Sequence, residues 1–124
     1  MYTELKKKLS KDESGLLTYE YIANNMGAIH AIMPELVQNI IDVDHTGQFV
    51  VSTARYLNAI SKEKYAAEID SLIKAAIEKD RERKYLGALV VDFWGSDYKE
   101  HVTELIASSD NFRRIYKRLY PTGI

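Results

Sequence analysis

Hydrophobic positions along this chain recur with the spacing of an α-helix rather than that of a strand. In residues 66–79 apolar residues recur at intervals of three or four positions, so together they form one continuous helical face. That face consists of Ile69, Leu72, Ile73, Ala76 and Ile77. Alternation of apolar and polar residues, which a half-buried strand needs, is not sustained anywhere in the sequence. The pattern therefore predicts an all-α protein.

Two later segments carry the same spacing. In residues 84–94 the apolar face consists of Leu86, Leu89, Val90 and Phe93. In residues 111–120 the apolar face consists of Phe112, Ile115, Tyr116 and Leu119. The opposite side of that last segment is cationic and consists of Arg113, Arg114, Lys117 and Arg118. Both segments are predicted to be amphipathic helices that pack on a common core.

Residues that typically begin or end helices divide the chain into short helical segments. Pro34 is placed to open a helix, and glycines at 15, 27, 47 and 95 mark breaks. The expected N-caps are Thr18, Ser61, Asp97 (with Glu100 in a capping box) and Ser109 or Asp110. These signals predict seven or eight helices in a single domain, 1–124, at residues 2–9, 18–27, 33–42, 47–60, 62–79, 83–94, 97–107 and 110–120. Short connections favour an antiparallel helical bundle or a short stack of helical hairpins.

A shift of 36 residues superimposes part of the chain on itself. Leu36 then corresponds to Leu72, and Asp44 corresponds to Asp80. Amphipathic helices drift into phase at this shift, because 36 residues make about ten helical turns. The matched break between helices nevertheless favours a true repeat. Repeats of roughly this length are typical of stacked helix pairs.

Residues 32–60 resemble a HEAT repeat. The positions that fit are Pro34, Leu36, Ile41, Asp42, Val51, Ala54 and Leu57. The turn is about two residues longer than in that pattern, and the basic residue expected early in the second helix is absent. About a quarter of the chain carries the resemblance, which implies a HEAT-like stack of helical hairpins.

Residues 42–53, DVDHTGQFVVST, also look like the first part of an EF-hand calcium loop. Six positions match in register, and they are Asp42, Asp44, Thr46, Gly47, Gln48 and Phe49. Thr53 stands where a bidentate glutamate would complete the cage. The windows 10–21 and 78–89 were compared as partner loops, and each lacks required residues. We therefore expect a turn in which Asp44 or Thr46 caps the next helix, with weak cation binding by Asp42, Asp44, Thr46 and Gln48 as the alternative.

The remaining sequence carries no signature of catalysis or of a cofactor. The chain has no cysteine, which excludes disulfides, thiol nucleophiles and zinc–thiolate sites. His30, His45 and His101 share no metal-ligand spacing, and His30 is expected to be packed or at the boundary of the core. No nucleophile elbow or phosphate-binding glycine loop occurs. The sequence predicts no enzyme, no metal site and no cofactor.

A protein–protein interaction module is the function that these observations favour. Nine tyrosines support it, because tyrosine is favoured at interfaces. A small bacterial adaptor or an immunity-type protein that neutralises a toxin is the expected role, by analogy alone. The partner is expected to be another protein, and a homodimer is an alternative. The lack of a secretion signal or an apolar membrane segment favours a cytoplasmic location and no membrane contact.

A second hypothesis, binding of nucleic acid, depends on two local groups of basic residues rather than on the net charge. The net charge is −1, from 17 basic and 18 acidic side chains, so the whole molecule does not attract nucleic acid. The cationic residues Arg113, Arg114, Lys117 and Arg118, with Lys6, Lys7 and Lys8 as a second group, nevertheless leave a nucleic-acid-binding regulator as an alternative. A degenerate calcium-binding helix–loop–helix protein is the third hypothesis.

Overall fold

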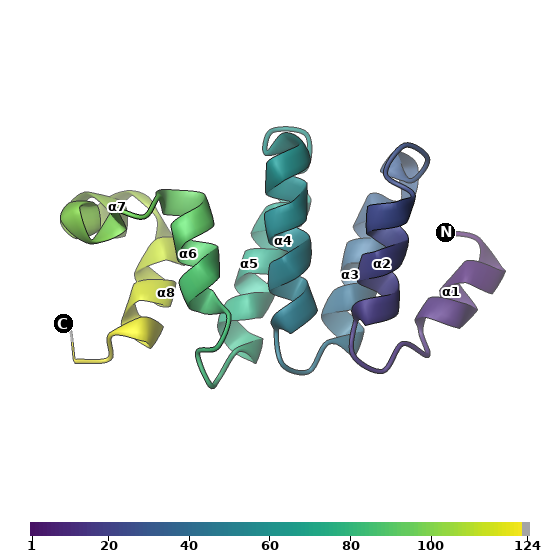
Figure 1. Cartoon of the computed structure of the whole chain (residues 1–124), viewed down its shortest axis with the longest axis horizontal. Helices are drawn as coiled ribbons and strands as arrows, with labels where there is room; N and C mark the ends of the chain where they lie inside the picture. Colours follow the sequence, from purple (N-terminus) through teal and green to yellow (C-terminus); the bar gives the residue numbers. More distant parts are fainter. Residues whose placement is uncertain (123–124) are drawn as a thin grey trace.

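Eight α-helices follow one another along residues 1–122, the part of the chain that the computed structural model describes (Figure 1). They are α1 (Thr3–Leu9), α2 (Leu16–Asn24), α3 (Met33–Val43), α4 (Gln48–Ser61), α5 (Ala66–Lys79), α6 (Leu86–Trp94), α7 (Val102–Ser108) and α8 (Asp110–Leu119). Two short 3-10 helices, η1 (His30–Ile32) and η2 (Tyr98–His101), precede α3 and α7. Residues 1–122 contain no β-strand, which confirms the all-α prediction. None of these helices is both long enough and apolar enough to span a bilayer.

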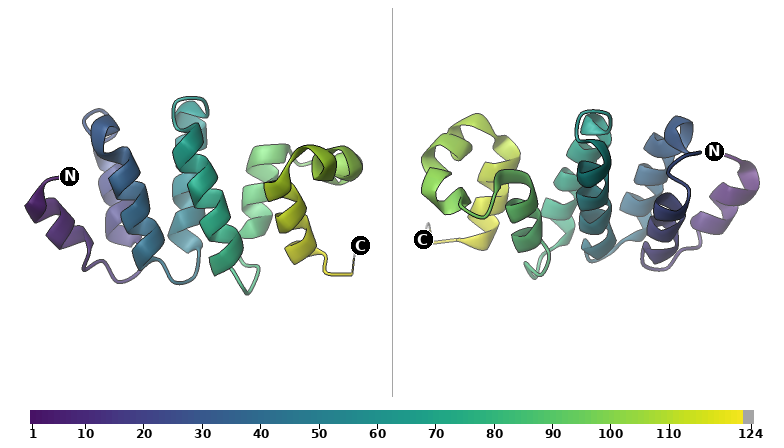
Figure 2. Two further views of the ribbon diagram at one scale, coloured as in Figure 1. Left: turned by 180° about the vertical axis from the view of Figure 1, so that it is seen from behind. Right: turned by 45° about the horizontal axis from the view of Figure 1, so that its top comes forward.

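The helices lie side by side in two layers. Helices α2, α4 and α6 form one layer, and α3, α5 and α8 form the other (Figures 1 and 2). Within each antiparallel pair, α2 packs on α3, α4 on α5, and α6 on α8. Neighbouring pairs contact each other through both layers. Helix α1 lies at one end of this row, and α7 lies at the other (Figure 1).

The core fills the space between the two layers. All five residues of the predicted apolar face of 66–79 are buried. Leu86, Leu89 and Val90 on α6 are buried too, as are Phe112 and Ile115 on α8. The outer members of those two faces are only partly buried, and they are Phe93, Tyr116 and Leu119. Periodicity therefore identified the side of each helix that faces the other layer.

Two expected helix starts, at Thr18 and after Ser61, are wrong. Thr18 is the third residue of α2, which begins at Leu16, and its hydroxyl group donates a hydrogen bond to Asp12. Ser61 ends α4, and the next helix starts at Ala66 rather than at residue 62. The chain turns before Thr18, but it turns after Ser61, whose Oγ atom accepts a hydrogen bond of 3.2 Å from the Lys64 N–H in that turn.

The predicted capping box at Asp97 is also wrong, whereas the cap at Ser109 is confirmed. Asp97 precedes η2 and makes no side-chain cap. Its carboxylate lies 3.2 Å from the Nε2 atom of His101 instead. The Ser109 Oγ atom accepts a hydrogen bond of 3.1 Å from the Phe112 N–H, so Ser109 caps α8. Pro34 lies in the first turn of α3, as expected.

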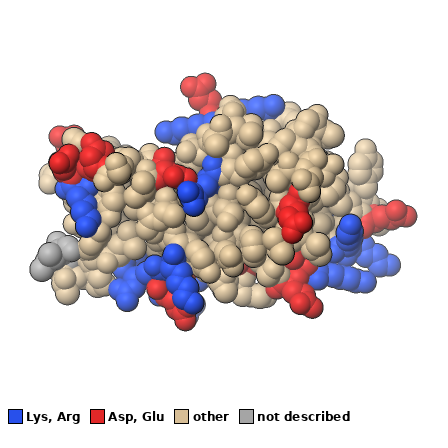
Figure 3. Space-filling view, viewed as in Figure 1, with Lys and Arg blue, Asp and Glu red and all other residues tan. Residues whose placement is uncertain are grey.

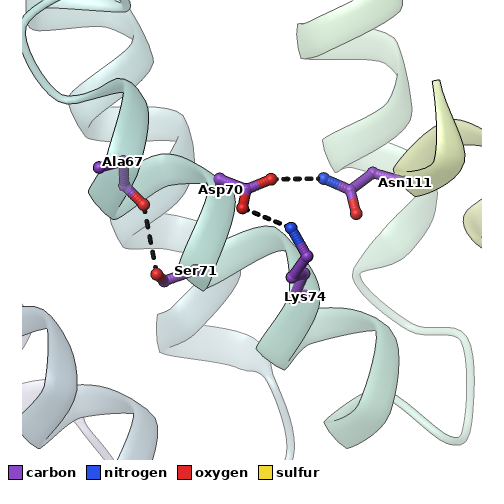
Figure 4. A network of polar contacts seen from close by, with 5 residues as sticks. All are labelled: Ala67, Asp70, Ser71, Lys74 and Asn111. Atoms are coloured by element: carbon purple, nitrogen blue, oxygen red, sulfur yellow. Dashed lines mark hydrogen bonds and ion pairs between the residues drawn. The ribbon is translucent and has the colours of Figure 1, made fainter. Parts of the chain in front are cut away.

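A polar network on the surface joins α5 to α8. The Asp70 carboxylate contacts Lys74 one turn later on α5 and accepts a hydrogen bond of 2.9 Å from the Asn111 side chain on α8 (Figure 4). The hydrogen bond with Lys74 lowers the pKa of Asp70, and partial burial opposes this effect only in part. The last helix is thus held on the stack by polar contacts as well as by its buried apolar face.

Candidate functional site

The stretch that resembles an EF-hand is a turn closed around one buried carboxylate. Asp44 is only 1% exposed. One of its oxygens accepts hydrogen bonds from the backbone N–H groups of Thr46 (2.9 Å) and Gly47 (3.0 Å). The other accepts from the N–H groups of Phe49 (3.0 Å) and Val50 (2.9 Å) in the first turn of α4. Of the two caps that the sequence left open, Asp44 and Thr46, Asp44 accepts the N–H groups of Phe49 and Val50, while the Thr46 Oγ1 atom accepts that of Gln48 at 3.3 Å.

Among the other proposed calcium ligands, Thr46 contacts this carboxylate, through a hydrogen bond of 3.3 Å from its hydroxyl, whereas Asp42 does not. Asp42 is exposed on α3 and accepts a hydrogen bond from the side chain of Gln38. The Thr53 hydroxyl donates to the Phe49 carbonyl oxygen at 2.7 Å, within α4. Four backbone N–H groups and the Thr46 hydroxyl all donate to the two oxygens of Asp44, which are therefore occupied as acceptors. Helix capping thus accounts for the residues that gave the stretch its likeness to a calcium loop.

The same turn occurs three times in the chain. Asp12 accepts from the N–H groups of Gly15 (3.0 Å) and Thr18 (2.8 Å), and Asp80 accepts from those of Tyr85 (2.7 Å) and Leu86 (2.9 Å). In each turn the N–H of the sixth residue after the aspartate donates to the same carboxylate oxygen, Oδ2. Asp12, Asp44 and Asp80 are also the three charged side chains that are buried within residues 1–122.

Hydrogen bonds hold the first of these carboxylates in its ionised form. Burial by itself would raise the pKa of Asp12. Hydrogen bonds from Thr18, Gly15 and Ser14 outweigh that effect, and the pKa of Asp12 is lowered. The stability that Asp12 contributes is therefore present above its ordinary pKa and lost as the pH falls through the lowered value.

Consecutive turns lie along one edge of the stack and pack against each other (Figure 1, lower edge). Gly47 has a φ of +92°, and a Cβ atom built there would lie 3.2 Å from the Cβ of Asp80. A Cβ atom at Gly15 would lie 3.4 Å from the Cβ of Asp44 in the same way. The Lys79 Nζ atom also donates a hydrogen bond of 2.7 Å to the Asp44 carbonyl oxygen. Each turn therefore rests on the aspartate of the next.

The third turn has arginine where the first two have glycine. Arg83 has a φ of +59° and is exposed. A left-handed conformation at a residue other than glycine is unfavourable, but no further aspartate turn follows along this edge within residues 1–122. A side chain is sterically tolerated there, whereas it would meet the next turn at Gly15 and Gly47.

Two glycine substitutions are expected to change stability in opposite directions. Gly47→Ala should lower the free energy of unfolding by about 2 kcal/mol, because alanine disfavours positive φ and its Cβ would crowd Asp80. Gly87→Ala should raise it by about 0.8 kcal/mol, because Gly87 is an exposed α6 residue with no atom within 4 Å of the added carbon. Urea denaturation followed by circular dichroism measures both. Equal effects of the two changes would contradict the close packing of the turn at Gly47 against Asp80.

The predicted cationic side of α8 is partly committed to contacts within the protein. Arg113 pairs with Asp110 at 2.6 Å. Arg118 donates a hydrogen bond of 2.5 Å to the Ile77 carbonyl oxygen near the end of α5. Arg114 and Lys117 complete the group, while Lys6, Lys7 and Lys8 are exposed on α1 at the other end of the stack. The two cationic groups therefore do not form one surface, and Figure 3 shows acidic residues interspersed among the basic ones.

The tyrosines mostly pack against the core rather than form an exposed binding surface. Among the nine, all of which lie in the part of the chain that the structure describes, only Tyr2 is exposed. The Tyr19 ring lies 6.2 Å from that of Phe49 and 6.3 Å from that of Tyr56, which joins α2 to α4. Burial raises the pKa of Tyr98 to about 12, and its hydroxyl lies 2.8 Å from that of Tyr120. The tyrosine content is therefore explained by packing between helices.

The three histidines lie apart, and one of them joins an acidic group that the sequence interpretation did not select. His30, which was expected to be packed or at the boundary of the core, is exposed, and the centre of its ring lies 6.0 Å from that of the Tyr65 ring. His45 and His101 are exposed as well. Ligand atoms of Asp97, Glu100 and His101 lie within 4.8 Å of one another. Their i, i+3, i+4 spacing was the signal for this proximity, and all three side chains are exposed.

The outward surface of α2, α4 and α6, called the α2–α4–α6 face below, carries few charges. Its twelve exposed residues include three charged ones, Glu20, Arg55 and Asp92. Arg55 and Asp92 neutralise each other in an ion pair of 2.5 Å. In contrast, eight of the thirteen exposed residues of α3, α5 and α8 are charged. Figure 3 shows the α2–α4–α6 face, with a broad area between the charged side chains that is neither acidic nor basic.

Exposed apolar side chains also concentrate on these three helices. Of the five large apolar residues left exposed within residues 1–122, four belong to them. They are Leu16 (43% exposed), Leu17 (48%), Ile60 (51%) and Val91 (41%). Small residues, Gly87 and Ala88, lie beside Val91. Helical periodicity alone did not reveal this surface, because it identifies the buried side of a helix and not which helices share a layer.

Comparison of the chain with protein-family models, with curated proteins and with solved structures found no match.

Proposed function

We propose that this protein is a non-enzymatic protein-interaction module that binds its partner with the α2–α4–α6 face. The observation that carries the proposal is the contrast between the two layers, in which exposed apolar residues gather on the layer with few charges. The centre of a protein interface is typically depleted of charged residues and contains apolar side chains that lose their water on binding. The α2–α4–α6 face has this composition, whereas the α3–α5–α8 surface is typical of a solvated exterior.

The architecture supports the same proposal. We infer that the pairs α2–α3, α4–α5 and α6–α8 are successive units of a HEAT-like helical repeat. The correspondence of Asp44 with Asp80 in sequence and the aspartate turn before each of α2, α4 and α6 support this inference. Stacked units of this kind present one long surface made of equivalent helices, which suits recognition of another protein.

The buried carboxylates favour binding rather than catalysis. Asp12, Asp44 and Asp80 all accept backbone N–H groups at the starts of helices. Their oxygens are occupied by these backbone N–H groups, so the three carboxylates serve the turns rather than act as free bases. An adaptor, or an inhibitor such as an immunity protein, is the role that we propose for the α2–α4–α6 face.

A single arginine on this face should abolish partner capture. Val91→Arg introduces a charge at an exposed apolar position, so it should reduce recovery of the bound protein at least tenfold, about 1.4 kcal/mol, while the fold is retained. The measurement is quantitative mass spectrometry of proteins co-purified with the tagged chain from its own source cells. Ala67→Arg is the matched control, because Ala67 is an exposed helical residue of α5 in the other layer.

The control decides between this face and other surfaces. Loss of the same protein with Val91→Arg but not with Ala67→Arg would support the proposal. Equal capture by both variants would contradict it, as would turnover of a small substrate by the purified protein. Circular dichroism of both variants checks that each retains its helices.

A further inference from the structure

A second surface with binding character lies at the α7 end of the stack. Between α7 and α8 runs an open groove of about 440 Å³, called the α7–α8 groove below. Val102 and Ile106 line it from α7, and Tyr116 and Tyr120 line it from the direction of α8. Within each pair the two residues are four apart, so they follow one another along the groove. Arg113 and Lys117 of α8, together with Pro121, complete the lining.

The apolar side of α7 is incompletely covered by the rest of the protein. No residue of α7 is buried, although it contains three apolar residues of medium or large size, Val102, Leu105 and Ile106. All three are only partly buried. Helix α7 packs mainly on α8 and η2, because it lies at the end of the row of helices (Figures 1 and 2). The groove therefore exposes apolar surface that a second chain would remove from water.

Cations surround this apolar surface. Lys117 is exposed and makes no ion pair with a carboxylate of residues 1–122. Arg113 is 46% exposed at its side chain even though it pairs with Asp110. The Lys99 Nζ atom lies 5.0 Å from the centre of the Tyr120 ring, and the hydrogen bond with Tyr120 raises the pKa of Lys99. Three positive charges thus flank a groove whose floor is apolar and aromatic.

We propose that the α7–α8 groove binds an acidic amphipathic helix of a partner protein. Its apolar side chains would lie between Val102, Ile106 and Tyr116, and its carboxylates would meet Lys117, Arg113 and Lys99. Helices with one apolar face commonly bind in grooves in this way, with anchor residues one turn apart. Charge complementarity sets the orientation and speeds association, while the apolar contacts supply most of the affinity. This site is separate from the α2–α4–α6 face and does not depend on it.

Nucleic acid fits the same surface less well. Phosphate binding needs cations that are free to follow the backbone of the nucleic acid. Here Arg118 is bound to the Ile77 carbonyl oxygen, so it is not free to do this. The apolar lining of the groove cannot form favourable contacts with a phosphate backbone, whereas it can pack against leucine-like side chains.

A binding assay with defined probes tests the proposal. The probe is a fluorescein-labelled synthetic helix of about 14 residues, four turns, with leucine along one face and glutamate on its flanks. A second peptide has lysine in place of every glutamate, and a third probe is labelled single-stranded DNA. Fluorescence polarisation at low salt measures binding to the full chain, to Lys117→Glu and to the control Lys64→Glu. Lys64 is an exposed lysine in the connection between α4 and α5, far along the chain from the groove.

The expected result is selective loss of binding by one variant. The acidic peptide should bind the unmodified protein and Lys64→Glu equally, and Lys117→Glu should weaken binding about tenfold. The lysine peptide should not bind. Val91→Arg should bind the acidic peptide as the unmodified protein does, so failure of the α2–α4–α6 face as an interface would leave this result unchanged.

Three outcomes would overturn the proposal. They are no binding of the acidic peptide, equal binding by Lys117→Glu and the unmodified protein, and tighter binding of the DNA than of the acidic peptide. Circular dichroism of Lys117→Glu shows whether the variant is folded. Because Lys117 is exposed and makes no ion pair within residues 1–122, the change should leave the helices intact.

Discussion

Asp44→Ala should lower the free energy of unfolding by about 3 kcal/mol, because it removes one acceptor shared by four backbone N–H groups. Two of these groups belong to the first turn of α4, and alanine cannot accept a hydrogen bond from them. The N–H groups of Gly47 and Val50 lie in buried residues, where water cannot replace the carboxylate. Urea denaturation followed by circular dichroism measures the change.

Asp42→Ala is the matched control for this experiment. Asp42 is two residues away and equally acidic, but it is exposed and accepts a hydrogen bond only from the Gln38 side chain. Its replacement should change the free energy of unfolding by less than about 0.5 kcal/mol. A calcium loop would use both aspartates as ligands. The capping interpretation would be refuted if the two changes had similar effects on the free energy of unfolding and had them only in the presence of calcium.

Phe112→Ala should destabilise the last helices by about 4 kcal/mol and should separate them from the rest of the protein during unfolding. The Phe112 ring is fully buried and contacts Trp94 (5.5 Å between ring centres), Tyr98 and Tyr116. It therefore joins α8 to α6 and η2. In a stack of helix pairs each unit contacts only its neighbours, so a cavity at one end should first loosen that end.

Two optical signals distinguish local from global loosening. Trp94, the one tryptophan in the sequence, reports on the α6–α8 end, whereas circular dichroism reports on all helices. In Phe112→Ala the tryptophan signal should change at a lower urea concentration than the circular dichroism signal. Leu36→Ala, a cavity in α3, is the control and should not show this order. Coincident transitions in Phe112→Ala would indicate a single cooperative bundle instead of a stack.

The helices themselves could be predicted from the sequence because burial of one face imposes a period of about 3.6 residues. Five of the six buried residues of α5 follow from that period, and the sixth is Ala75. Helix starts could not be predicted as well, because the acceptor for the Thr18 N–H is an aspartate six residues earlier. Standard capping patterns place the acceptor within three residues of the N–H group, so they pointed to Thr18 itself.

Comparison of the sequence with itself reveals only two of the three aspartate turns. A shift of 36 residues relates Asp44 to Asp80, but Asp12 lies 32 residues before Asp44. The difference arises because α2 and α3 have 9 and 11 residues, whereas α4 and α5 have 14 each, and the longer connection 25–32, compared with 62–65, offsets only half of that difference. The three windows compared with an EF-hand loop nevertheless place these aspartates at the same position, the third. The likeness to a calcium loop was therefore a sign of the turn.

The candidate binding surfaces depend on which helices become neighbours, and periodicity carries no such information. Val91 and Leu16 are 75 positions apart in the sequence, and they share a face because α2, α4 and α6 form one layer. The cationic residues of α8 were visible from sequence, but their contacts with Ile77 and Asp110 were not. Neither was the groove that α7 forms beside them.

Because the turns pack against each other, the two edges of the stack differ in their tolerance of insertions and deletions. On the turn edge, each connection carries an aspartate and rests on the next one, so an added residue would misplace two helix starts at once. On the opposite edge the connections are residues 25–32, 62–65 and 95–109, and the last of these includes a whole helix (Figure 1). Insertions and deletions should therefore accumulate on that edge alone, where α7 and its groove already stand as an elaborated connection.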